Sequence, residues 1–295
     1  MYQMVAVRKE MEFTKTMGEI VEVLKAIAST EYFSLQKRRK KFNEFEEHLQ
    51  GFFELVNVEG LTHPFLSSSS EATNIVLITS EAGFLGKLNT LIVNTAIEEY
   101  KKGDLITVVG KQGARYIQEH GLKYSYLPGI DDNISYDKII KLRDIIVTKF
   151  LDEKLGSTII IYPHFVSFAA QEVKKMQILP GRFLFPEKAQ FEPQSASGVF
   201  RPQLPHHKRE IIIEPSINRS VEYLIKIWIE QIISFIFWES KLSEWASRVI
   251  HLERSSDEIK KEEKELKRLY FRLRHRISDK NIREIYASRL AIRQN

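Results

Sequence analysis

The sequence contains no cysteine, so it has no disulfide, thiolate zinc site, iron–sulfur cluster or cysteine nucleophile. Glycine and proline are also scarce, with 13 and 9 among 295 residues, which argues against a disordered chain and against an all-β protein with many tight turns. The net charge of +5 is a mild excess, whereas nucleic-acid-binding proteins usually concentrate basic residues on one face. This composition predicts a soluble, helix-rich protein inside the cell.

No segment has the length and composition of a membrane span or an export signal. The N-terminus reaches charged residues within eight positions, so it lacks the apolar core of a signal peptide. The most apolar helical stretch, Leu224–Trp238, is interrupted by Lys226 and Glu230, and a span needs about 20 mostly apolar residues. The longest uncharged run, Leu155–Gln171, contains Pro163 and is predicted to be a strand followed by a loop. We therefore expect a protein that does not cross a membrane.

Both ends of the chain have the apolar spacing of long helices. In the first region, about Val5 to Leu55, apolar residues recur at gaps of three, four and seven. They are Ile20, Val23, Leu24, Ile27, Leu35, Phe42, Phe45, Leu49, Phe52 and Phe53. The region from about Ser216 to the end has the same pattern and no proline. Its apolar positions are Val221, Leu224, Trp228, Ile232, Phe235, Leu242, Trp245, Val249, Leu252, Ile259, Leu266, Leu269, Leu273, Ile277, Ile282, Ile285 and Leu290.

Helices of this length need a partner. At about 1.5 Å per residue, the two would span about 75 Å and about 110 Å, and periodicity beyond about 25 residues is typical of a coiled coil. Neither helix is stable alone, so we expect the two to pair antiparallel, each burying its apolar stripe against the other. Such a rod transmits force or holds a distance rather than carrying out chemistry.

The middle of the chain alternates short apolar runs with helix-like stretches. The expected strands are Asn74–Thr79, Leu105–Val109 and Thr158–Tyr162, with Lys175–Leu184 and Ile211–Glu214 as further candidates. The expected helices are Leu88–Lys101, Ala114–His120 and Ile139–Lys154. This alternation implies βαβ units and a mainly parallel sheet. We therefore predict an α/β fold in which a central Rossmann-like α/β domain, residues 72–208, lies between an N-terminal coiled-coil helix, 1–58, and a C-terminal coiled-coil helix, 216–295.

Two glycine-containing turns follow the first two predicted strands. Gly83–Lys87 lies where a phosphate-binding loop would lie, but the spacing of its glycines and the leucine after its lysine do not match the Walker or dinucleotide patterns. Gly110–Gly113 has the equivalent place after the second strand. For both segments we favour a tight strand-to-helix turn over a phosphate site.

Other chemically active groups are poorly arranged for catalysis or metal binding. The adjacent His206 and His207 would point in different directions and make a poor chelate. Four other histidines show no i, i+4 pairing: His120, His164, His251 and His275. No serine, histidine and aspartate follow a nucleophile-elbow pattern. We therefore expect no catalytic residue, no metal site and no cofactor.

A basic run, Lys37–Lys41, lies on the first helix. It could contact nucleic acid, an anionic membrane surface or an acidic collar of a partner protein, or it could be a solvated helix face. The acidic Glu44, Glu46 and Glu47 follow directly, which argues against nucleic acid.

Several stretches of the chain match one known family. Ile78–Asn89 (ITSEAGFLGKLN) is similar to the family pattern ITSDRGLCGGLN, and Val109–Gly113 is similar to its second glycine turn. Tyr162–Ser167 and Gln177–Pro180 are similar to its YN-x-F stretch and its later leucine–proline. Ile27–Gln36 matches its first helix in part. Over essentially its whole length, the chain resembles the gamma subunit of F-type ATP synthases, the central rotor shaft.

The C-terminal stretches carry the strongest part of this resemblance. Glu214–Ser216 and Glu239–Arg248 follow the family pattern EPS…ES-x-ASE-x-x-x-R. Leu269–His275 and Ile282–Ile285 are similar to its LxYNRxRQ…I-x-EI. The departures are an acid–arginine pair, a cysteine, a glycine and an asparagine of the family, replaced here by Glu81 and Ala82, Leu85, Lys87 and Phe271. The chain is thus similar to a divergent gamma subunit.

The resemblance implies a central-stalk rotor that couples ion-driven rotation of a c ring to ATP synthesis or hydrolysis in a ring of alpha and beta subunits. It implies a non-catalytic subunit of a proton- or sodium-translocating complex, with the nucleotide sites in that ring and with the epsilon subunit and the c ring as further partners. It also implies a peripheral position on the cytoplasmic, or equivalent inner, face of an energy-coupling membrane, without a membrane span and without nucleic acid.

The positions of individual residues relative to the gamma-subunit pattern also imply which of them contact the partners. For the alpha/beta ring these are Ile20, Val23, Leu24, Ile27, Arg272, Arg274, Arg276, Arg283 and Arg289. For the epsilon subunit and the c ring they are Gly83, Gly86, Lys87, Asn89 and Lys111.

Two other functions remain open from the sequence. One is the shaft of a repurposed rotary ATPase that is not attached to a standard ion rotor. The other is a small-molecule-binding α/β module carried on a coiled coil, which predicts saturable nucleotide or phosphate binding through Gly83–Lys87.

Overall fold

The computed structural model describes residues 2–37, 49, 52, 53, 56, 58, 60–68, 70–83, 85, 87–130, 134–185 and 213–293, with side chains for all of these except 2 and 288–293. The chain divides into two compact units. The first, here called the helix pair, contains α1 (Tyr2–Gln36) up to Ser34, Leu85, and α6 (Ile217–Arg293) from Glu244 onward. The second, here called the sheet unit, contains the described residues from Leu35 to Gly83 and from Lys87 to Ser243.

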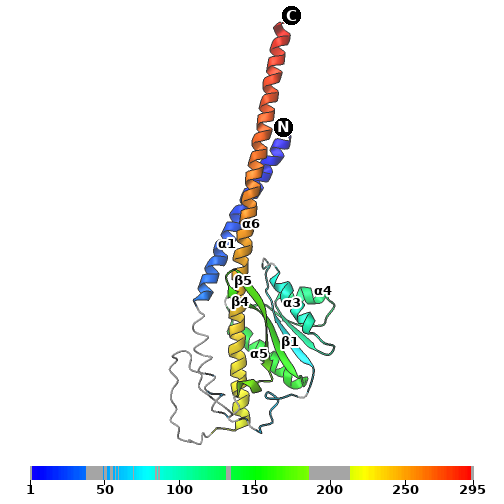
Figure 1. Ribbon diagram of the computed structural model, residues 1–295, viewed down its shortest axis with the longest axis vertical. Helices are drawn as coiled ribbons and strands as arrows, with labels where there is room; N and C mark the ends of the chain where they lie inside the picture. The colour runs from blue at the N-terminus through cyan, green and yellow to red at the C-terminus, as the bar shows by residue number, and fades with distance from the viewer. Residues whose placement is uncertain are drawn as a thin grey trace. The chain divides into compact units, whose positions relative to one another are not determined.

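A five-stranded sheet forms the centre of the sheet unit (Figure 1). Its strands are β1 (Thr73–Ile78), β2 (Leu105–Val109), β3 (Ser125–Leu127), β4 (Ser157–Ser167) and β5 (Ala170–Leu179). They lie in the order β3-β2-β1-β4-β5, and β5 alone runs antiparallel to its neighbour. The central β1 aligns Asn74 with Leu105 of β2 and with Thr158 of β4. This order and direction are those of a doubly wound, Rossmann-like sheet.

Helices cover both faces of this sheet, so the strands read as nearly continuous apolar runs. On one face lie α3 (Leu88–Glu99) and α4 (Lys111–Glu119). On the other face, α5 (Tyr136–Asp152) and the part of α6 before Glu244 share one buried cluster with Val76 and Ile78 of β1. The neighbouring Ile75 and Leu77 are also fully buried and, by the alternation of side chains along a strand, face α3.

The three predicted strands Asn74–Thr79, Leu105–Val109 and Thr158–Tyr162 are all present. β3 was not predicted, because it has three residues, two of them exposed, and no apolar run. The prediction of a strand at Lys175–Leu184 was placed too late: β5 ends at Leu179 and a short 3-10 helix follows at Arg182–Leu184. The intervening Pro180 has no N–H with which to continue the ladder. Of the candidate strand Ile211–Glu214, the first two residues lie outside the described part, and the last two are not in a strand.

The prediction of a loop after Tyr162 was also wrong, because β4 continues through Pro163 to Ser167. β4 has passed the end of β1 there, since the last paired residue of β1, Leu77, lies opposite Ile161. The carbonyl of Pro163 accepts a hydrogen bond from the Ser243 hydroxyl of α6 at 3.3 Å, so the backbone polar groups of Pro163 face away from β5. A proline at that position therefore removes no ladder hydrogen bond.

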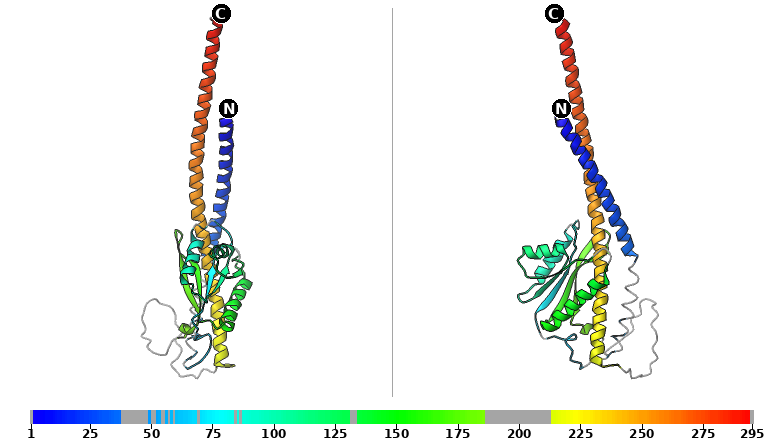
Figure 2. Two further views of the ribbon diagram at one scale, coloured as in Figure 1. Left: turned by 90° about the vertical axis from the view of Figure 1, so that its right-hand side faces the viewer. Right: turned by 180° about the vertical axis from the view of Figure 1, so that it is seen from behind.

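In the helix pair, α1 runs antiparallel to the part of α6 after Ser243; the two lie side by side in the left view of Figure 2 and cross in the right view. The contacts confirm the direction, because Glu22 meets Ser256 while Lys25, farther along α1, meets the earlier residue Glu253. The predicted first helix is present over Tyr2–Gln36, and Leu49, Phe52 and Phe53 are also helical. Residues 38–48, 50, 51, 54 and 55 of that prediction lie outside the described part. An N-terminal helix, an α/β sheet and a 77-residue C-terminal helix confirm the predicted fold class.

Candidate functional site: two faces of the helix pair

The inward-facing residues of α1 recur at alternating steps of three and four. Those with buried or half-buried side chains are Val7, Met11, Thr14, Val21, Lys25, Ala28 and Tyr32, with Gly18 in the same series. On α6 the corresponding series is Trp245, Val249, Leu252, Ser256, Ile259, Glu263 and Leu266. A repeat of 3.5 residues is the pattern of a left-handed coiled coil. We call these two series the seam of the helix pair.

Gly18 marks a close approach in the seam. A Cβ atom at this position would lie 3.2 Å from Cγ2 of Ile259, which is tighter than an ordinary van der Waals contact. The absence of a side chain therefore lets α1 approach α6 at this level. The sequence carries this signal as one of only two glycines in the first 55 residues.

The first four residues of the stripe predicted to face α6 lie instead on the outside of α1. Ile20, Val23, Leu24 and Ile27 are exposed by 47, 61, 41 and 50%. The expectation that these four bury themselves against the C-terminal helix was therefore wrong, whereas Leu35, Leu49 and Phe53 of the same stripe are buried. The seam uses the positions one residue later, which on a helix lie about 100° away.

The outer stripe is longer than the spacing from Ile20 onward indicated. Phe13 and Met17 precede Ile20 at the same steps of four and three, and they are exposed by 66 and 38%. We call Phe13, Met17, Ile20, Val23, Leu24 and Ile27 the outer stripe of α1. Extending the spacing backward from Ile20 would have identified its first two members.

Polar contacts between α1 and α6 accompany the less apolar seam. The carboxylate of Glu22 accepts a hydrogen bond from the Ser256 hydroxyl at 2.7 Å and lies 2.9 Å from the Lys260 ammonium. The Lys25 ammonium lies 2.8 Å from Glu22 and 3.0 Å from Glu253. In this rotation of the helices, Glu22 and Lys25 of α1 both bond to residues of α6.

This network shifts the pKa of both partners on α1. The ammonium of Lys25, then the Ser256 hydroxyl and the Lys260 ammonium, lower the pKa of Glu22 from 4.5 to about 2. Hydrogen bonds to Glu22 and then to Glu253 raise the pKa of Lys25. Both groups are therefore charged across the ordinary pH range.

The far part of α6 carries exposed basic residues. Arg272, Arg274, Arg276 and Arg283, which were predicted to contact the alpha/beta ring, are all exposed, while the side chain of Arg289 lies outside the described part. Apolar side chains are exposed on the same part of the helix: Phe271, Ile282, Ile285 and Tyr286.

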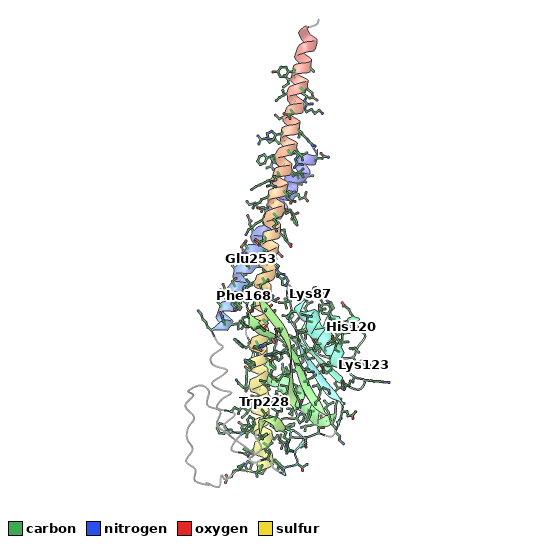
Figure 3. All side chains as sticks on the ribbon, viewed as in Figure 1. Lys87, His120, Lys123, Phe168, Trp228 and Glu253 are labelled. Atoms are coloured by element: carbon green, nitrogen blue, oxygen red, sulfur yellow. The ribbon has the colours of Figure 1, made fainter. Side chains whose placement is uncertain are left out.

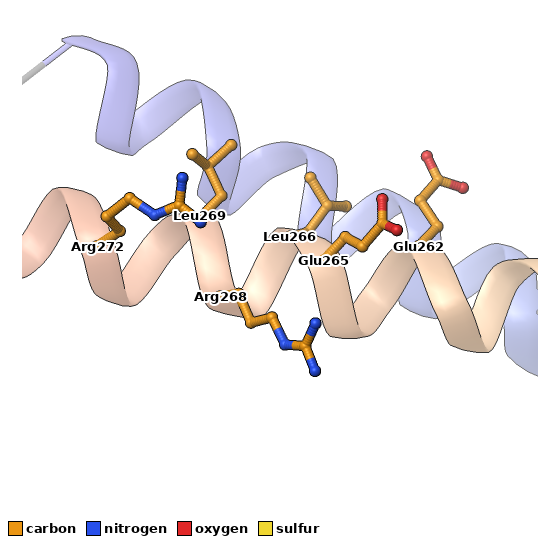
Figure 4. Close-up of a pocket in the computed structure, with 6 residues that line it drawn as sticks. All are labelled: Glu262, Glu265, Leu266, Arg268, Leu269 and Arg272. Atoms are coloured by element: carbon orange, nitrogen blue, oxygen red, sulfur yellow. The ribbon is translucent and has the colours of Figure 1, made fainter.

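A shallow hollow on α6 is lined by Glu262, Glu265, Leu266, Arg268, Leu269 and Arg272. Figure 4 shows Leu266 and Leu269 pointing toward α1 and Arg268 pointing away from it. Charges of both signs on one open helix face lack the apolar enclosure of a small-molecule site. This hollow is part of the helix-pair surface rather than a ligand pocket.

The second glycine turn packs against the residue that follows β1. Gly110 has a φ of +101°, and a Cβ atom there would lie 2.2 Å from the Thr79 carbonyl oxygen. The Gly113 amide donates a hydrogen bond to Oγ1 of Thr79 at 3.1 Å. Close backbone packing between β1 and α4 therefore requires these glycines.

At the carboxyl edge of the sheet, the hydrogen-bond donors and the ammonium group that could bind a phosphate already contact a carboxylate. Glu81 accepts a hydrogen bond from the Gly129 amide and one from the Tyr126 hydroxyl at 3.3 Å, and it lies 3.8 Å from the Lys111 ammonium. Burial, and then the nearby Glu81, raise the pKa of Tyr126. An anion placed here would meet the negative charge of Glu81. The arrangement favours the tight-turn interpretation of both glycine segments.

The residues predicted to contact the epsilon subunit and the c ring divide into exposed and buried groups. Gly83, Lys87 and Lys111 are exposed, and Figure 3 shows Lys87 at the surface. Asn89 is buried, and it braces the turn by donating to the Ser80 hydroxyl at 2.9 Å and accepting from the Ser80 amide at 3.3 Å. Gly86 lies outside the described residues.

Within the described part of the chain, no three histidine, aspartate or glutamate side chains are grouped so that they could hold a metal ion. Among the same residues, no helix is long and apolar enough to span a bilayer. His206 and His207 lie outside the described part, as does the basic run after Lys37.

Comparison with known proteins gives a match over nearly the whole chain. A family model described as ATP synthase matches residues 3–292. The chain is 22% identical to the ATP synthase gamma chain of Methylobacillus flagellatus, over 97% of this chain and 98% of that one. It is 23% identical to the ATP synthase gamma chain of Symbiobacterium thermophilum, over 95% of both.

Solved structures give a fold match of the same extent. A chain in the OSCP/F1/c-ring structure of the Euglena gracilis mitochondrial ATP synthase aligns with a TM-score of 0.70 at 16% identity, over 98% of this chain and 94% of that chain. A chain in the central stalk and c-ring structure of the Tetrahymena thermophila enzyme aligns with a TM-score of 0.58 at 20% identity, over 80% and 99%. At these identities the likeness concerns the fold.

Proposed function

This chain belongs to the ATP synthase family, and we propose that within the family it is a gamma chain, the central-stalk rotor of an F-type rotary ATPase. Gamma-chain relatives align over nearly their full length, so both the helix pair and the sheet unit have counterparts in them. The rotor couples rotation of a c ring to conformational change in the ring of alpha and beta subunits. The nucleotide sites lie in that ring rather than on this chain.

The observation that carries this proposal is the outer stripe of α1. A two-helix coiled coil that worked alone would bury its most apolar series, whereas this one exposes Phe13, Met17, Ile20 and Leu24. Contiguous exposed apolar surface marks a protein–protein contact. The surface fits the inner wall of a ring that surrounds the helix pair.

The contact chemistry suits a surface that turns against its partner. Apolar contact is non-directional, so it persists as the partner side chains change. The exposed arginines of α6 add ion pairs that contribute about 0–1 kcal/mol each at a solvated surface. We assign Ile20, Val23, Leu24 and Ile27 to the apolar contact, and Arg272, Arg274, Arg276, Arg283 and Arg289 to contacts with acidic loops of the beta subunits.

The sheet unit supplies the contact with the other rotor subunits in this proposal. Gly83, Lys87 and Lys111 are exposed at one edge of the sheet, and we assign them, with Gly86, to the epsilon subunit and the c ring. Asn89 acts through the turn that it braces rather than by direct contact. The protein is then peripheral to the cytoplasmic, or equivalent inner, face of an energy-coupling membrane.

A single-cysteine experiment tests the ring contact, because the chain has no cysteine of its own. We would assemble I20C with alpha and beta subunits, each beta subunit carrying one cysteine on its inner wall. Oxidation is expected to cross-link I20C to a beta subunit and to stop ATP hydrolysis until a reductant is added. The matched control is V21C, whose side chain is 8% exposed in the seam and which should not cross-link.

Purification of the tagged chain from native membranes tests the larger assembly. Recovery of alpha, beta, epsilon and c subunits, with ATP hydrolysis confined to the complex, is expected. Alpha- and beta-like partners without a c ring would indicate a repurposed motor. Recovery of the chain alone with bound nucleotide, or equal cross-linking of I20C and V21C, would contradict the rotor assignment.

A further inference from the structure

The part of α6 in the sheet unit rests on the sheet mainly through aliphatic side chains. The fully buried residues of its inner face follow one another at steps of four and three: Val221, Ile225, Ile229, Ile233 and Ile236. Such contacts contribute most of the burial but have no preferred direction. Hydrogen bonds have a preferred geometry, so they add a directional constraint that these apolar contacts do not supply.

Three hydrogen-bonded contacts follow directly after this aliphatic row. Nδ1 of His164 on β4 lies 2.8 Å from the Glu239 carboxylate. The Ser243 hydroxyl, one turn later on α6, donates to the carbonyl oxygen of Pro163 at 3.3 Å. We call these residues, together with Trp238 and Leu35, the α6 clamp.

The third contact of the clamp ties α6 to the end of α1. Nε1 of Trp238 donates to the carbonyl oxygen of Leu35 at 3.0 Å. Leu35 lies in the last turn of α1, where helix carbonyls have no partner within their own helix. At one level, α6 is therefore bonded on one side to β4 and on another to α1.

The clamp is buried, which makes its geometry specific. The side chain of Glu239 is 3% exposed, Ser243 is fully buried, and Trp238 is 2% exposed. A buried carboxylate or hydroxyl that loses its partner keeps the full cost of desolvation. Rotation or sliding of α6 against β4 would break these bonds together, so the clamp fixes the helix in one orientation.

We propose that the α6 clamp is the joint through which torque passes between the sheet unit and α6. This inference rests on the proposed rotor function and adds positioning residues to it. α6 is one continuous helix of 77 residues and belongs to both units, so rotation of the sheet reaches its far end only if the helix cannot turn on the sheet. His164, Glu239 and Ser243 prevent that turn, and none of them needs to touch a partner subunit.

The decisive variant removes the bond without leaving a buried charge. Replacing both partners with apolar side chains of similar shape, H164L together with E239M, keeps packing while removing the directional contact. The exchange H164E with E239H restores a bonded pair and serves as the rescue. S243A, which truncates a small side chain, provides a second, independent loss. K175Q is the control, because it removes the 2.6 Å ion pair of β5 with Glu99 without touching α6.

The measurement is the angular fluctuation of a bead on the sheet unit while the assembled alpha/beta ring is held in one nucleotide state. The bead is attached through K123C, because Lys123 is exposed and projects from the sheet edge opposite the first half of α6 (Figure 3). Mutations along a physical network can change coupling by about twofold or more. We therefore expect the angular variance to rise about twofold or more in H164L/E239M and in S243A, and to return in the exchange variant.

A merely structural role would give a different result. The clamp variants should hydrolyse ATP at the wild-type rate while pumping fewer ions per ATP in the membrane complex, since hydrolysis needs less torque through the joint. Wild-type variance in both H164L/E239M and S243A, or a rise equal to that of K175Q, would overturn the inference while leaving the rotor function in place. A wild-type chain that neither assembles nor rotates in the ring would overturn the proposed function and the clamp together.

Discussion

The carboxylate of Glu22 on α1 lies 2.9 Å from the ammonium of Lys260 on α6, across the seam of the helix pair. Lys25 and Ser256 bond to the same carboxylate and hold its pKa at about 2. The seam is thus set by ionic and hydroxyl groups as well as by apolar contact, and it leaves the outer stripe of α1 free for another protein.

The stability of the helix pair should fall in acid because of Glu22. A carboxyl whose folded pKa is lowered stabilises the fold above its ordinary pKa of 4.5, and the contribution disappears as the pH falls through its folded value of about 2. We expect the melting temperature of the wild type to exceed that of E22Q at pH 6 and the difference to vanish between pH 4.5 and 2. Thermal unfolding followed by circular dichroism measures this, and a constant difference across that range would contradict it.

The neighbours Ile20 and Val21 should separate partner binding from stability. Val21 is 8% exposed in the seam, so V21A should reduce the free energy of unfolding of the isolated chain by about 1–2 kcal/mol. Ile20 is 47% exposed, so I20A should change it by less than about 0.5 kcal/mol. In the assembled complex, I20A should nevertheless weaken binding to the alpha/beta ring. Urea unfolding and ring titration together test this, and equal destabilisation by both variants would contradict it.

The glycines of the two turns should respond differently to alanine. G110A places a Cβ 2.2 Å from a backbone oxygen at a positive φ and should destabilise the chain by about 2 kcal/mol or more. Among the residues that the structure describes, and apart from its chain neighbours, no atom lies within 4 Å of a Cβ atom at Gly83, and the φ of Gly83 is not positive, so G83A should lie within about 0.5 kcal/mol of the wild type. Chemical unfolding compares the two variants, and a large loss of stability in G83A would contradict the open environment of this turn.

Truncation after Arg268 should separate the two units functionally. All residues beyond this point belong to the helix pair, whereas the part of α6 in the sheet unit ends at Ser243. We expect unfolding of the sheet unit to change by less than about 0.5 kcal/mol, while ATP-driven pumping in the complex is reduced because Arg272, Arg274 and Arg276 are lost. Proteolysis kinetics and pumping assays measure the two effects. Comparable losses in both would contradict this division of labour.

Much of the fold could be predicted from the sequence because its signals are local. Apolar runs indicated three of the five strands, and the 3.5-residue spacing identified the long helices. The turns at Gly83 and Gly110 were located by glycine after a strand. β3 was not predicted because three residues, two of them exposed, have no apolar pattern. The predicted end of β4 was too early because Pro163 was expected to end the strand. Proline is tolerated there because its backbone polar groups face away from β5.

Local sequence patterns indicated three of the five strands, the two apolar-rich helices at the ends and the family resemblance, and the composition excluded cysteine chemistry. Which side of each helix is buried became visible only in the folded chain. Ile20 and Val21 are both apolar and adjacent in the sequence, yet Val21 faces α6, on the side where Glu22 and Lys25 bond to that helix, and Ile20 is exposed. Likewise, His164 and Glu239 are 75 residues apart, so only the folded chain brings them together. Apolar spacing and turn residues depend on a few neighbouring positions, whereas the face of a helix that is buried depends on residues that are distant in the sequence.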